Sequence, residues 1–342
     1  NAIAFSAGDG KVLWSTPLTS KRPKHGYPGS RCTPFVDGDR VYVTTSDGSI
    51  ACLKAGDGKI VWQKQFKKEW KGRMMSGWGY SESPIVDGDH VICTPGSKEA
   101  MFVALDKKTG KEIWRTKLPD DLGGKGKDGA GYSSTVVSHG AGVKQYLQMT
   151  GRGVISARAS DGKFLWNYNP VANGTANIPN PIPYGDHVFC STGYGTGSAL
   201  LKLSKDGAGV KAEQVYWLEA GVLQNHHGGL VKVGDYIYTG HRHNSGYPLC
   251  LEAASGKVKW GGDFRGPGEG SAAVLYVDGH LIFRYQKKGV VALIEATPEE
   301  YRLKGTFKPK YVSGPSWSHP VVVNGRLYLR EKDKLMCYDI KS

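Results

Sequence analysis

Short stretches that alternate apolar and polar residues run along most of the chain, a pattern typical of half-buried β-strands. Many of them flank tight turns, as at Asp37-Gly38, Asp87-Gly88, Asp278-Gly279 and Asn324-Gly325. Asp-Gly and Asn-Gly between apolar runs are strong signals for β-hairpins. Few segments show helical periodicity, and the pattern therefore predicts an all-β fold.

A second pattern repeats at a longer interval. Five segments contain Gly-Lys-x-x-Trp, as in Gly110-Lys111-Glu112-Ile113-Trp114, and a sixth tryptophan follows a longer turn; the six are Trp14, Trp62, Trp114, Trp166, Trp217 and Trp260. Successive tryptophans lie about 43 to 52 residues apart, a period typical of propellers and solenoids. We therefore expect a β-propeller of four-stranded antiparallel blades, with strands A to D in each and the tryptophan on strand D, between neighbouring sheets.

The number of blades has two interpretations. Seven A-B-C sets open near Arg31, Ser81, Tyr132, Asn177, His226, Ser271 and Trp317. Residues 11–14 supply a strand D that the last set lacks, so seven blades could close by pairing the two ends of the chain. Residues 2–5 resemble a strand C, so residues 1–18 could instead be part of an eighth, incomplete blade. We favour eight blades, with residues 19–342 as seven repeats and residues 1–342 as a single domain.

Residues 103–114 carry the fullest form of the repeat, Ala-x-Asp-x-x-Thr-Gly-Lys-x-x-Trp. This unit resembles the repeat of the pyrroloquinoline-quinone-type propellers, which include quinoprotein alcohol dehydrogenases and the scaffold lipoprotein of outer-membrane assembly. Residues 73–84 and 225–229 resemble a secreted subgroup common in planctomycete-type bacteria. The resemblance implies a bacterial periplasmic or secreted protein. The dehydrogenases carry a vicinal cysteine pair near the quinone, and this chain has none.

Composition adds three constraints. The formal net charge is +14, which favours acidic partners, but the basic residues are spread over turns without an aromatic-basic stripe, so we expect no nucleic-acid binding. No apolar stretch is long enough for a membrane-spanning helix. The six cysteines form no C-x-x-C motif, and their shared strand positions indicate small buried side chains.

The residues with functional chemistry lie in two kinds of segment, the D-A crossings between blades and the B-C loops. Both should face the same side of a propeller, whereas the A-B and C-D turns are generic. Loops on a rigid scaffold are where binding residues concentrate, so we predict a polar axial pocket. Its catalytic candidates are His226, His227 and Glu82, and its ligand-binding candidates are Arg31, Trp78, Tyr80, Asn177, His241, His243, Glu269, Arg284, Trp317, His319 and Arg330.

Individual candidates also have simpler interpretations. Glu82 could only pair with Arg31 or Arg73, and the two histidines of Asn225-His226-His227-Gly228 could only hydrogen-bond within their loop. Metal binding by His226, His241 and His243 has no supporting spacing, so we predict no metal.

The predicted function is binding of a small anionic or carbohydrate-like ligand, because arginines suit carboxylates and sulfates. A histidine base oriented by Glu82 or Glu269 would suit an oxidoreductase. Pyrroloquinoline quinone is the cofactor that the resemblance implies, without support from a cysteine pair. The alternatives are a non-catalytic scaffold for protein partners and a lyase acting on an acidic polysaccharide. We expect His227→Ala and Arg284→Ala to abolish ligand binding with almost unchanged thermal melting.

Overall fold

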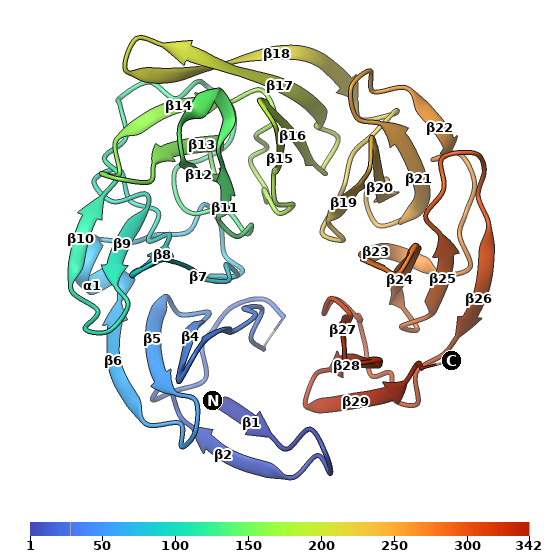
Figure 1. Ribbon diagram of the computed structural model, residues 1–342, viewed down its shortest axis with the longest axis horizontal. Coiled ribbons are helices and arrows are strands. Elements are labelled where there is room, and N and C mark those ends of the chain that lie inside the picture. Colours follow the sequence, from blue (N-terminus) through green and yellow to red (C-terminus); the bar gives the residue numbers. More distant parts are fainter. Residues whose placement is uncertain (28, 342) are drawn as a thin grey trace. The chain divides into compact units, whose positions relative to one another are not determined.

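The computed structural model describes residues 1–27 and 29–341, and its strands confirm an all-β fold of the propeller class. The described strands form seven antiparallel blades (Figure 1), which is the second of the two expected counts, and one further two-stranded sheet. The chain divides into two compact units: unit 1 contains residues 1–177 and 204–212, and unit 2 contains residues 178–203 and 213–342. Each unit is described by itself below.

Unit 1 begins with the two-stranded sheet β1 (Ala2–Phe5) and β2 (Val12–Thr16), followed by three four-stranded blades. These are blade 1, with β3 (Phe35–Asp37), β4 (Arg40–Thr44), β5 (Ser49–Lys54) and β6 (Ile60–Gln65); blade 2, with β7 (Ile85–Asp87), β8 (His90–Cys93), β9 (Val103–Asp106) and β10 (Glu112–Arg115); and blade 3, with β11 (Val136–Ser138), β12 (Gln145–Thr150), β13 (Gly153–Arg158) and β14 (Phe164–Tyr168). A short helix, α1 (Phe66–Trp70), follows β6.

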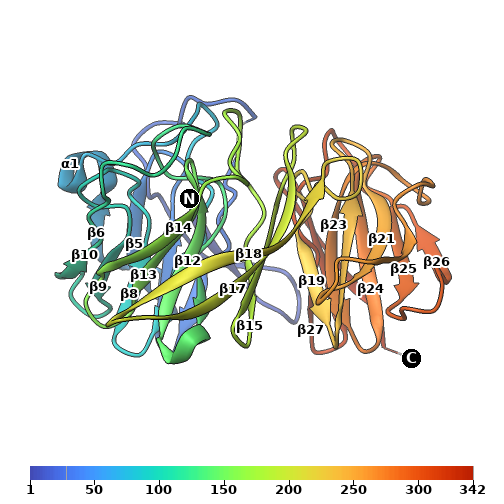
Figure 2. The same cartoon turned by 90° about the horizontal axis from the view of Figure 1, so that it is seen from above.

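The remaining strands form blades 4 to 7. These are blade 4, with β15 (Ile182–Tyr184), β16 (His187–Thr192), β17 (Gly197–Asp206) and β18 (Gly209–Glu219); blade 5, with β19 (Leu230–Val233), β20 (Tyr236–His241), β21 (Tyr247–Glu252) and β22 (Val258–Gly261); blade 6, with β23 (Glu269–Val277), β24 (His280–Lys287), β25 (Val291–Glu295) and β26 (Leu303–Phe307); and blade 7, with β27 (Val321–Val323), β28 (Arg326–Glu331) and β29 (Lys334–Asp339). Figure 2 shows the long β17–β18 hairpin, which the sequence did not predict. Its tip belongs to unit 1, where Arg158 Nη2 donates to the carbonyl of Ala208 over 2.8 Å.

Strand β2 pairs with β1, with Ala4 opposite Trp14, as expected if residues 1–18 are part of an incomplete blade in which residues 2–5 are a strand C. The other interpretation, in which residues 11–14 supply the fourth strand of the last blade, is wrong, because β27, β28 and β29 form a three-stranded sheet. The two strands are joined by a short turn that is closed by hydrogen bonds from Ser6 N to Lys11 O and from Gly10 N to Ser6 O. Pairing with a neighbour in sequence loses less chain entropy than pairing with a distant strand.

The repeated tryptophan and glycine contact each other across successive repeats. A Cβ atom at Gly110 would lie 2.6 Å from the Trp62 ring, and one at Gly162 would lie 2.3 Å from Trp114. Gly110 also has a φ of +70°, which glycine adopts without strain. In addition, Trp62 Nε1 donates to the carbonyl of Lys107 over 3.1 Å. Trp14, Trp62 and Trp114 are therefore each held by the C-D turn of the next repeat, which explains why the motif recurs there as a unit.

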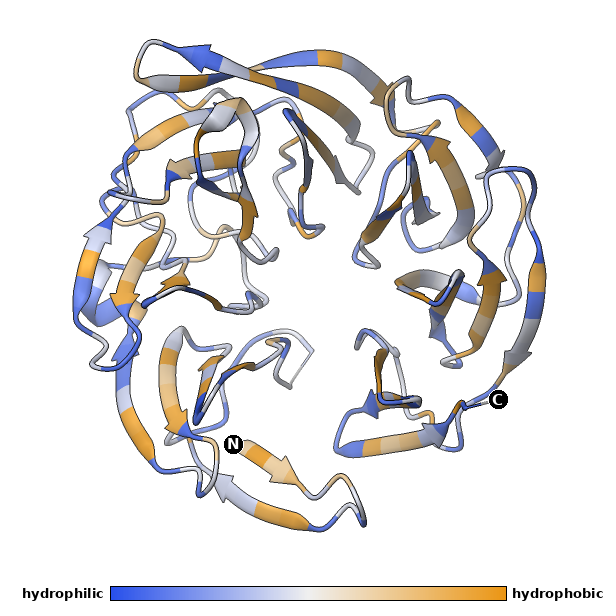
Figure 3. Cartoon of the chain, viewed as in Figure 1, coloured by the Kyte–Doolittle hydropathy of each residue, from blue (hydrophilic) through white to orange (hydrophobic). Residues whose placement is uncertain are grey.

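The core lies between the blades, where the middle strands carry continuous apolar residues (Figure 3). Tyr42, Cys52 and Trp62 of blade 1 pack with Val91, Cys93 and Leu105 of blade 2 in one buried cluster. The first strands of neighbouring blades also contact each other, β3 with β7 in unit 1, and β15 with β19 and β19 with β23 in unit 2. Within each unit, this arrangement brings the D-A crossings of neighbouring blades together.

Candidate functional site

The D-A crossing that leads into blade 5 forms the centre of a polar cluster in unit 2. Asn225 is 1% exposed, and its side-chain Nδ2 donates to Thr239 Oγ1 over 2.8 Å and to the carbonyl of Gly240 over 3.0 Å. A Cβ atom at Gly228 would lie only 1.6 Å from the carbonyl oxygen of Ala272, so this position requires glycine. The crossing is thereby fixed directly against β23, with His226 and His227 between two anchored residues.

His226 is buried and contacts residues from three other segments. Its Nδ1 lies 2.9 Å from Ser271 Oγ on β23, and its Nε2 lies 3.1 Å from the hydroxyl of Tyr194 in the β16–β17 loop. The ring centroid of His243, in the β20–β21 loop, lies 3.9 Å from that of His226. The ring centroid of His227, the next residue in the chain, lies 4.0 Å from that of His226. D-A crossings and B-C loops thus meet on one side of unit 2, as the repeat predicts.

The imidazoles of this cluster are held in their neutral form. Burial, together with the smaller effect of neighbouring histidines, lowers the pKa of His226 to about 2 and that of His227 to about 3. Burial also lowers the pKa of His241 to about 4 and shifts that of His243 downward. At neutral pH the cluster therefore offers hydrogen-bonding nitrogens and carries no positive charge.

Two buried ring nitrogens of the cluster, His227 Nε2 and His243 Nδ1, have no hydrogen-bond partner among residues 1–27 and 29–341. The buried Nε2 of His241, which no ring contact joins to the cluster, also has none. A buried polar atom without a partner costs free energy, and such atoms in a native site suggest an absent ligand or water. Trp317 adds an aromatic wall, because its ring meets that of His227 edge-on with centroids 5.5 Å apart.

The two loops that carry Tyr194 and His243 adopt strained backbone conformations. Tyr194 has a φ of +58°, and Arg242 and Asn244 have φ values of +68° and +55°. Left-handed backbone at non-glycine residues is uncommon and tends to occur at functional sites. Sequence reasoning missed Tyr194, although its flanking residues Gly193 and Gly195 mark an unusual turn.

Arg284 has a structural partner that the sequence did not reveal. Its guanidinium is fully buried and bonds to Glu331 Oε2 over 2.8 Å and to the carbonyl of Ser318 over 2.9 Å. Glu331 also accepts a hydrogen bond of 2.7 Å from Ser316 Oγ. This buried pair fixes the 313–319 segment that carries Trp317, so the expectation that Arg284→Ala would leave melting unchanged does not fit the structure.

The other unit 2 candidates lie at varied depths. His241 is fully buried and accepts a hydrogen bond from the backbone N of Gln224 at 3.2 Å, whereas His319 and Arg330 are exposed. Glu269 is exposed and pairs with Lys287 at 3.4 Å. None of the printed hydrogen bonds or ion pairs among the described residues joins Glu269 to a histidine, so its expected orienting role stays a prediction.

Glu82 lies in unit 1, inside a separate polar network. It is 3% exposed and accepts a hydrogen bond from the backbone N of Thr94 over 2.8 Å. Burial raises its pKa to about 7 despite the hydrogen bonds from Thr94 and Gln148 that favour the carboxylate. The simpler interpretation of an ion pair with Arg31 or Arg73 is wrong, because Arg73 pairs with Asp128 at 2.9 Å and Arg31 bonds to backbone carbonyls.

The remaining unit 1 candidates serve the loops that carry them. Arg31 donates to the carbonyls of Trp78 and Gly26 over 2.6 and 2.7 Å. Tyr80 is buried, and its hydroxyl donates to the carbonyl of Pro95 over 2.9 Å. Asn177 is fully buried and donates to the carbonyl of Thr150 over 2.8 Å. Trp78 packs edge-on against Tyr132, with ring centroids 5.9 Å apart. A ligand role for these four residues stays a prediction.

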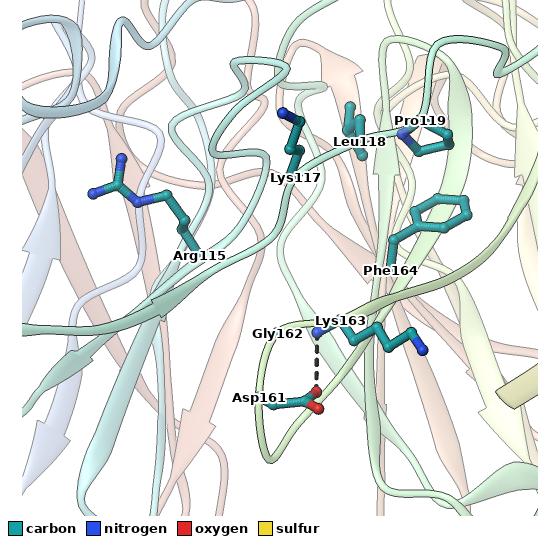
Figure 4. A pocket seen from close by; sticks show the side chains of 8 residues that line it. All are labelled: Arg115, Lys117, Leu118, Pro119, Asp161, Gly162, Lys163 and Phe164. Atoms are coloured by element: carbon teal, nitrogen blue, oxygen red, sulfur yellow. Dashed lines mark hydrogen bonds between the residues drawn. The ribbon is translucent and has the colours of Figure 1, made fainter. Parts of the chain in front are cut away.

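An open groove of about 440 Å³ lies elsewhere in unit 1 (Figure 4). Its lining comes from the end of blade 2 and the C-D turn of blade 3, namely Arg115, Lys117, Leu118, Pro119, Asp161, Gly162, Lys163 and Phe164. Asp161, Gly162 and Lys163 are generic C-D turn residues, and Asp161 accepts a hydrogen bond of 3.0 Å from the backbone N of Lys163. Lys117, Leu118 and Pro119 begin the D-A crossing between blades 2 and 3. The groove contains none of the predicted site residues and is a gap between blades.

The described residues contain no group of three or more His, Cys, Asp or Glu side chains arranged to hold a metal ion. They also fit pyrroloquinoline quinone poorly. This tricarboxylate calls for cationic groups, yet the clustered histidines are neutral and the Arg284 guanidinium is bonded to Glu331. The six cysteines are all free, and none is adjacent to another. No described helix has the length and apolar character needed to cross a membrane.

Comparisons with known proteins identify relatives of two kinds. The outer membrane protein assembly factor BamB of Xanthomonas campestris pv. campestris is 30% identical over 116 residues, 32% of this chain and 26% of the relative. The quinoprotein ethanol dehydrogenase of Pseudomonas aeruginosa is 33% identical over 142 residues, 37% of this chain and 22% of the relative. The matches thus span about a quarter of the length of these curated relatives.

Solved structures share the fold at low sequence identity. BamB from Moraxella catarrhalis superposes with a TM-score of 0.63 at 14% identity, covering 96% of this chain and 85% of the other. The quinohemoprotein alcohol dehydrogenase from Comamonas testosteroni gives 0.60 at 13% identity, covering 94% and 66%. A family model described as outer membrane protein assembly factor BamB, built on the PQQ-type repeat, matches residues 1–262. The chain therefore belongs to this family of PQQ-type repeat β-propellers.

Proposed function

We propose that the histidine cluster of unit 2 binds a small, hydroxyl-rich, carbohydrate-like ligand, and that the protein acts outside the cytoplasm. The observation that carries the proposal is a pair of buried ring nitrogens without partners among the described residues, His227 Nε2 and His243 Nδ1. Neutral imidazoles both donate and accept hydrogen bonds, which suits sugar hydroxyls. An aromatic wall such as Trp317 with a few convergent polar groups is typical of small-molecule sites.

The charge of the cluster separates the two ligand classes that the sequence suggested. An anionic ligand would gain little from imidazoles whose pKa values lie near 2 and 3. Arg284 is committed to Glu331, so its charge is already balanced. We therefore favour a neutral carbohydrate-like ligand over a small anion, and we place a lyase acting on acidic polysaccharides behind simple binding.

Isothermal titration calorimetry with cellotetraose, xylotetraose and trigalacturonate tests the proposal. We expect a neutral oligosaccharide to bind and His227→Phe, which keeps the ring but removes its nitrogens, to weaken binding about tenfold. His280→Gln is the matched control, because His280 lies in a hairpin turn of unit 2 and bonds to the carbonyl of Asp278 over 2.9 Å. Binding of trigalacturonate alone would reassign the site to anions, and no binding of any probe would refute the proposal.

The family match favours a second candidate, a scaffold for protein partners without catalysis. Its printed description is an outer membrane protein assembly factor, and the match covers residues 1–262. The same description supports the proposed location outside the cytoplasm. A scaffold role predicts that His227→Phe leaves the biological activity of the protein intact, so complementation of a deletion strain with this variant separates the two candidates.

A further inference from the structure

The D-A crossing that leads into blade 1 is strongly basic. Residues 17–34 contain no aspartate or glutamate, and they contain four basic residues, Lys21, Arg22, Lys24 and Arg31. The side chains of Lys21, Arg22 and Lys24 are exposed, and they have no ion-pair partner among residues 1–27 and 29–341. This crossing therefore carries a positive charge that no acidic side chain of the described protein balances.

A second group of cations lies on and directly after helix α1, in the crossing from blade 1 to blade 2. Lys67, Lys68 and Lys71 are exposed and also lack an ion-pair partner in the described part of the chain. The acidic residue of the helix, Glu69, lies 3.8 Å from the Nζ atom of Lys64 on β6. Its charge is thus shared with a different lysine, and the three exposed lysines add to the positive excess.

The two crossings contact each other within unit 1. Arg31 Nη1 donates to the carbonyl of Trp78 over 2.6 Å, and a Cβ atom at Gly26 would lie 3.0 Å from the Trp78 ring. In the other direction, a Cβ atom at Gly79 would lie 3.0 Å from the His25 ring. Two basic segments that are far apart in the sequence are therefore held on adjacent loops, which is why the sequence shows no continuous basic stripe.

The composition of this surface favours an anionic membrane over other acidic partners. Five of its six unpaired cations are lysines, which are depleted in protein interfaces, whereas arginine is preferred for bidentate recognition of carboxylates. None of the six lines the described groove of unit 1. Clusters of about 4–8 Lys and Arg bind anionic lipid headgroups without a groove. Tyr27, which is 58% exposed in the same crossing, is of a type enriched at membrane–water interfaces.

We propose that unit 1 has a docking surface for anionic phospholipid headgroups, formed by Lys21, Arg22, Lys24, Lys67, Lys68 and Lys71. The ammonium and guanidinium groups attract the lipid phosphates, and no covalent step is involved. Each cation near an anionic surface strengthens binding roughly fivefold, so six together give an attraction on the order of 10⁴-fold. The surface is separate from the histidine cluster of unit 2, so its test does not depend on the proposed function.

Cosedimentation of the full chain with lipid vesicles tests the proposal. We expect binding to vesicles of phosphatidylcholine and phosphatidylglycerol, none to phosphatidylcholine alone, and release in about 1 M NaCl, where the Debye length is about 3 Å. Lys21→Gln/Arg22→Gln/Lys24→Gln should weaken binding about a hundredfold, and Lys67→Gln/Lys68→Gln about thirtyfold. These five side chains are exposed, so the thermal melting of both variants should stay unchanged.

The matched control is Lys59→Gln/Lys111→Gln/Lys163→Gln, which removes the same net charge from three C-D turns of unit 1. These turns lie at the opposite end of each strand D from the crossings, so screening should limit the loss of binding to less than about threefold. Equal losses in the two triple variants, equal binding to both kinds of vesicle, or full binding by Lys67→Gln/Lys68→Gln would each overturn the proposal. Binding of polygalacturonate without binding of vesicles would also overturn it, in favour of an acidic polysaccharide.

Discussion

Replacing Arg284 with methionine should strongly destabilise unit 2. The change keeps an unbranched, flexible side chain, although a shorter one, and leaves Glu331, whose side chain is 1% exposed, without its cation. The remaining donors to the carboxylate are Ser316 Oγ at 2.7 Å and the backbone N of Ser313 at 3.3 Å. Removing one partner of a buried ion pair costs about 3–5 kcal/mol, because the other charge stays buried.

A double-mutant cycle isolates the pair. Arg284→Met/Glu331→Met removes both charges and should recover most of the lost stability, since apolar replacements of buried pairs are often neutral. Urea unfolding followed by tryptophan fluorescence measures the free energy of unfolding, and hydrogen exchange in residues 313–319 reports local opening. Arg302→Met is the matched control: Arg302 is 41% exposed and bonds to Glu295 and Glu300, so its loss should cost less than about 1 kcal/mol. Equal costs for Arg284→Met and Arg302→Met would refute the reasoning.

Three further predictions concern stability. Gly110→Ala should lower the free energy of unfolding, measured by thermal unfolding, by about 2 kcal/mol or more, because φ is +70° and the Trp62 ring blocks the added Cβ. Gly88→Ala is the control: its φ is +61° and the space around it is open, so it should lower the free energy of unfolding by only about 1 kcal/mol. Burial raises the pKa of Glu82 from 4.5 to about 7, so its contribution to the free energy of unfolding falls as the pH rises through this window. In urea titrations, the stability of Glu82→Gln relative to the unsubstituted protein should therefore be up to about 3 kcal/mol higher at pH 8 than at pH 4. A difference between the two proteins that does not change with pH would contradict the raised pKa. The pKa values of His226 and His227 are lowered from 6.5, so below pH 6.5 each histidine should reduce the free energy of unfolding by about 1.4 kcal/mol per pH unit. In the same titrations, the stability of the His226→Phe/His227→Phe variant should depend less steeply on pH.

The repeat made the fold predictable because its two marked residues touch each other. Gly110 and Trp62 lie about one repeat apart, and a Cβ atom at Gly110 would collide with the Trp62 ring. Both residues are part of the repeated motif, so the sequence pattern alone indicates that they belong together. The repeat also predicted that the D-A crossings and the B-C loops lie on the same side of the blades. In unit 2, residues of both kinds of segment meet, since His226 contacts His243 and Ser271. For β2 the sequence left two partners open, since periodicity does not distinguish a local hairpin with β1 from a distant strand of the last blade.

The chemistry of the site was less predictable because it depends on partners without fixed spacing. Arg284 and Glu331 come from different blades, so only the folded structure reveals that the guanidinium stabilises the fold. The loop containing Tyr194 reads as an ordinary glycine-rich turn until its left-handed backbone is seen. His226 is neutral because it is buried, and the depth of burial of a loop residue cannot be predicted from the sequence alone.

The contact between a tryptophan and the turn of the following repeat also constrains how these repeats can diverge. At Gly58, Gly110 and Gly162, a larger residue would displace the indole of the preceding repeat, so a substitution at either position disturbs two repeats. The one set that has lost its own tryptophan shows such a change: Trp260 meets Tyr301 edge-on at 5.7 Å, and its Nε1 bonds to the carbonyl of Thr297. A repeat such as that of Trp62, moved by itself into another protein, would therefore lose the contact between its tryptophan and the turn of the following repeat.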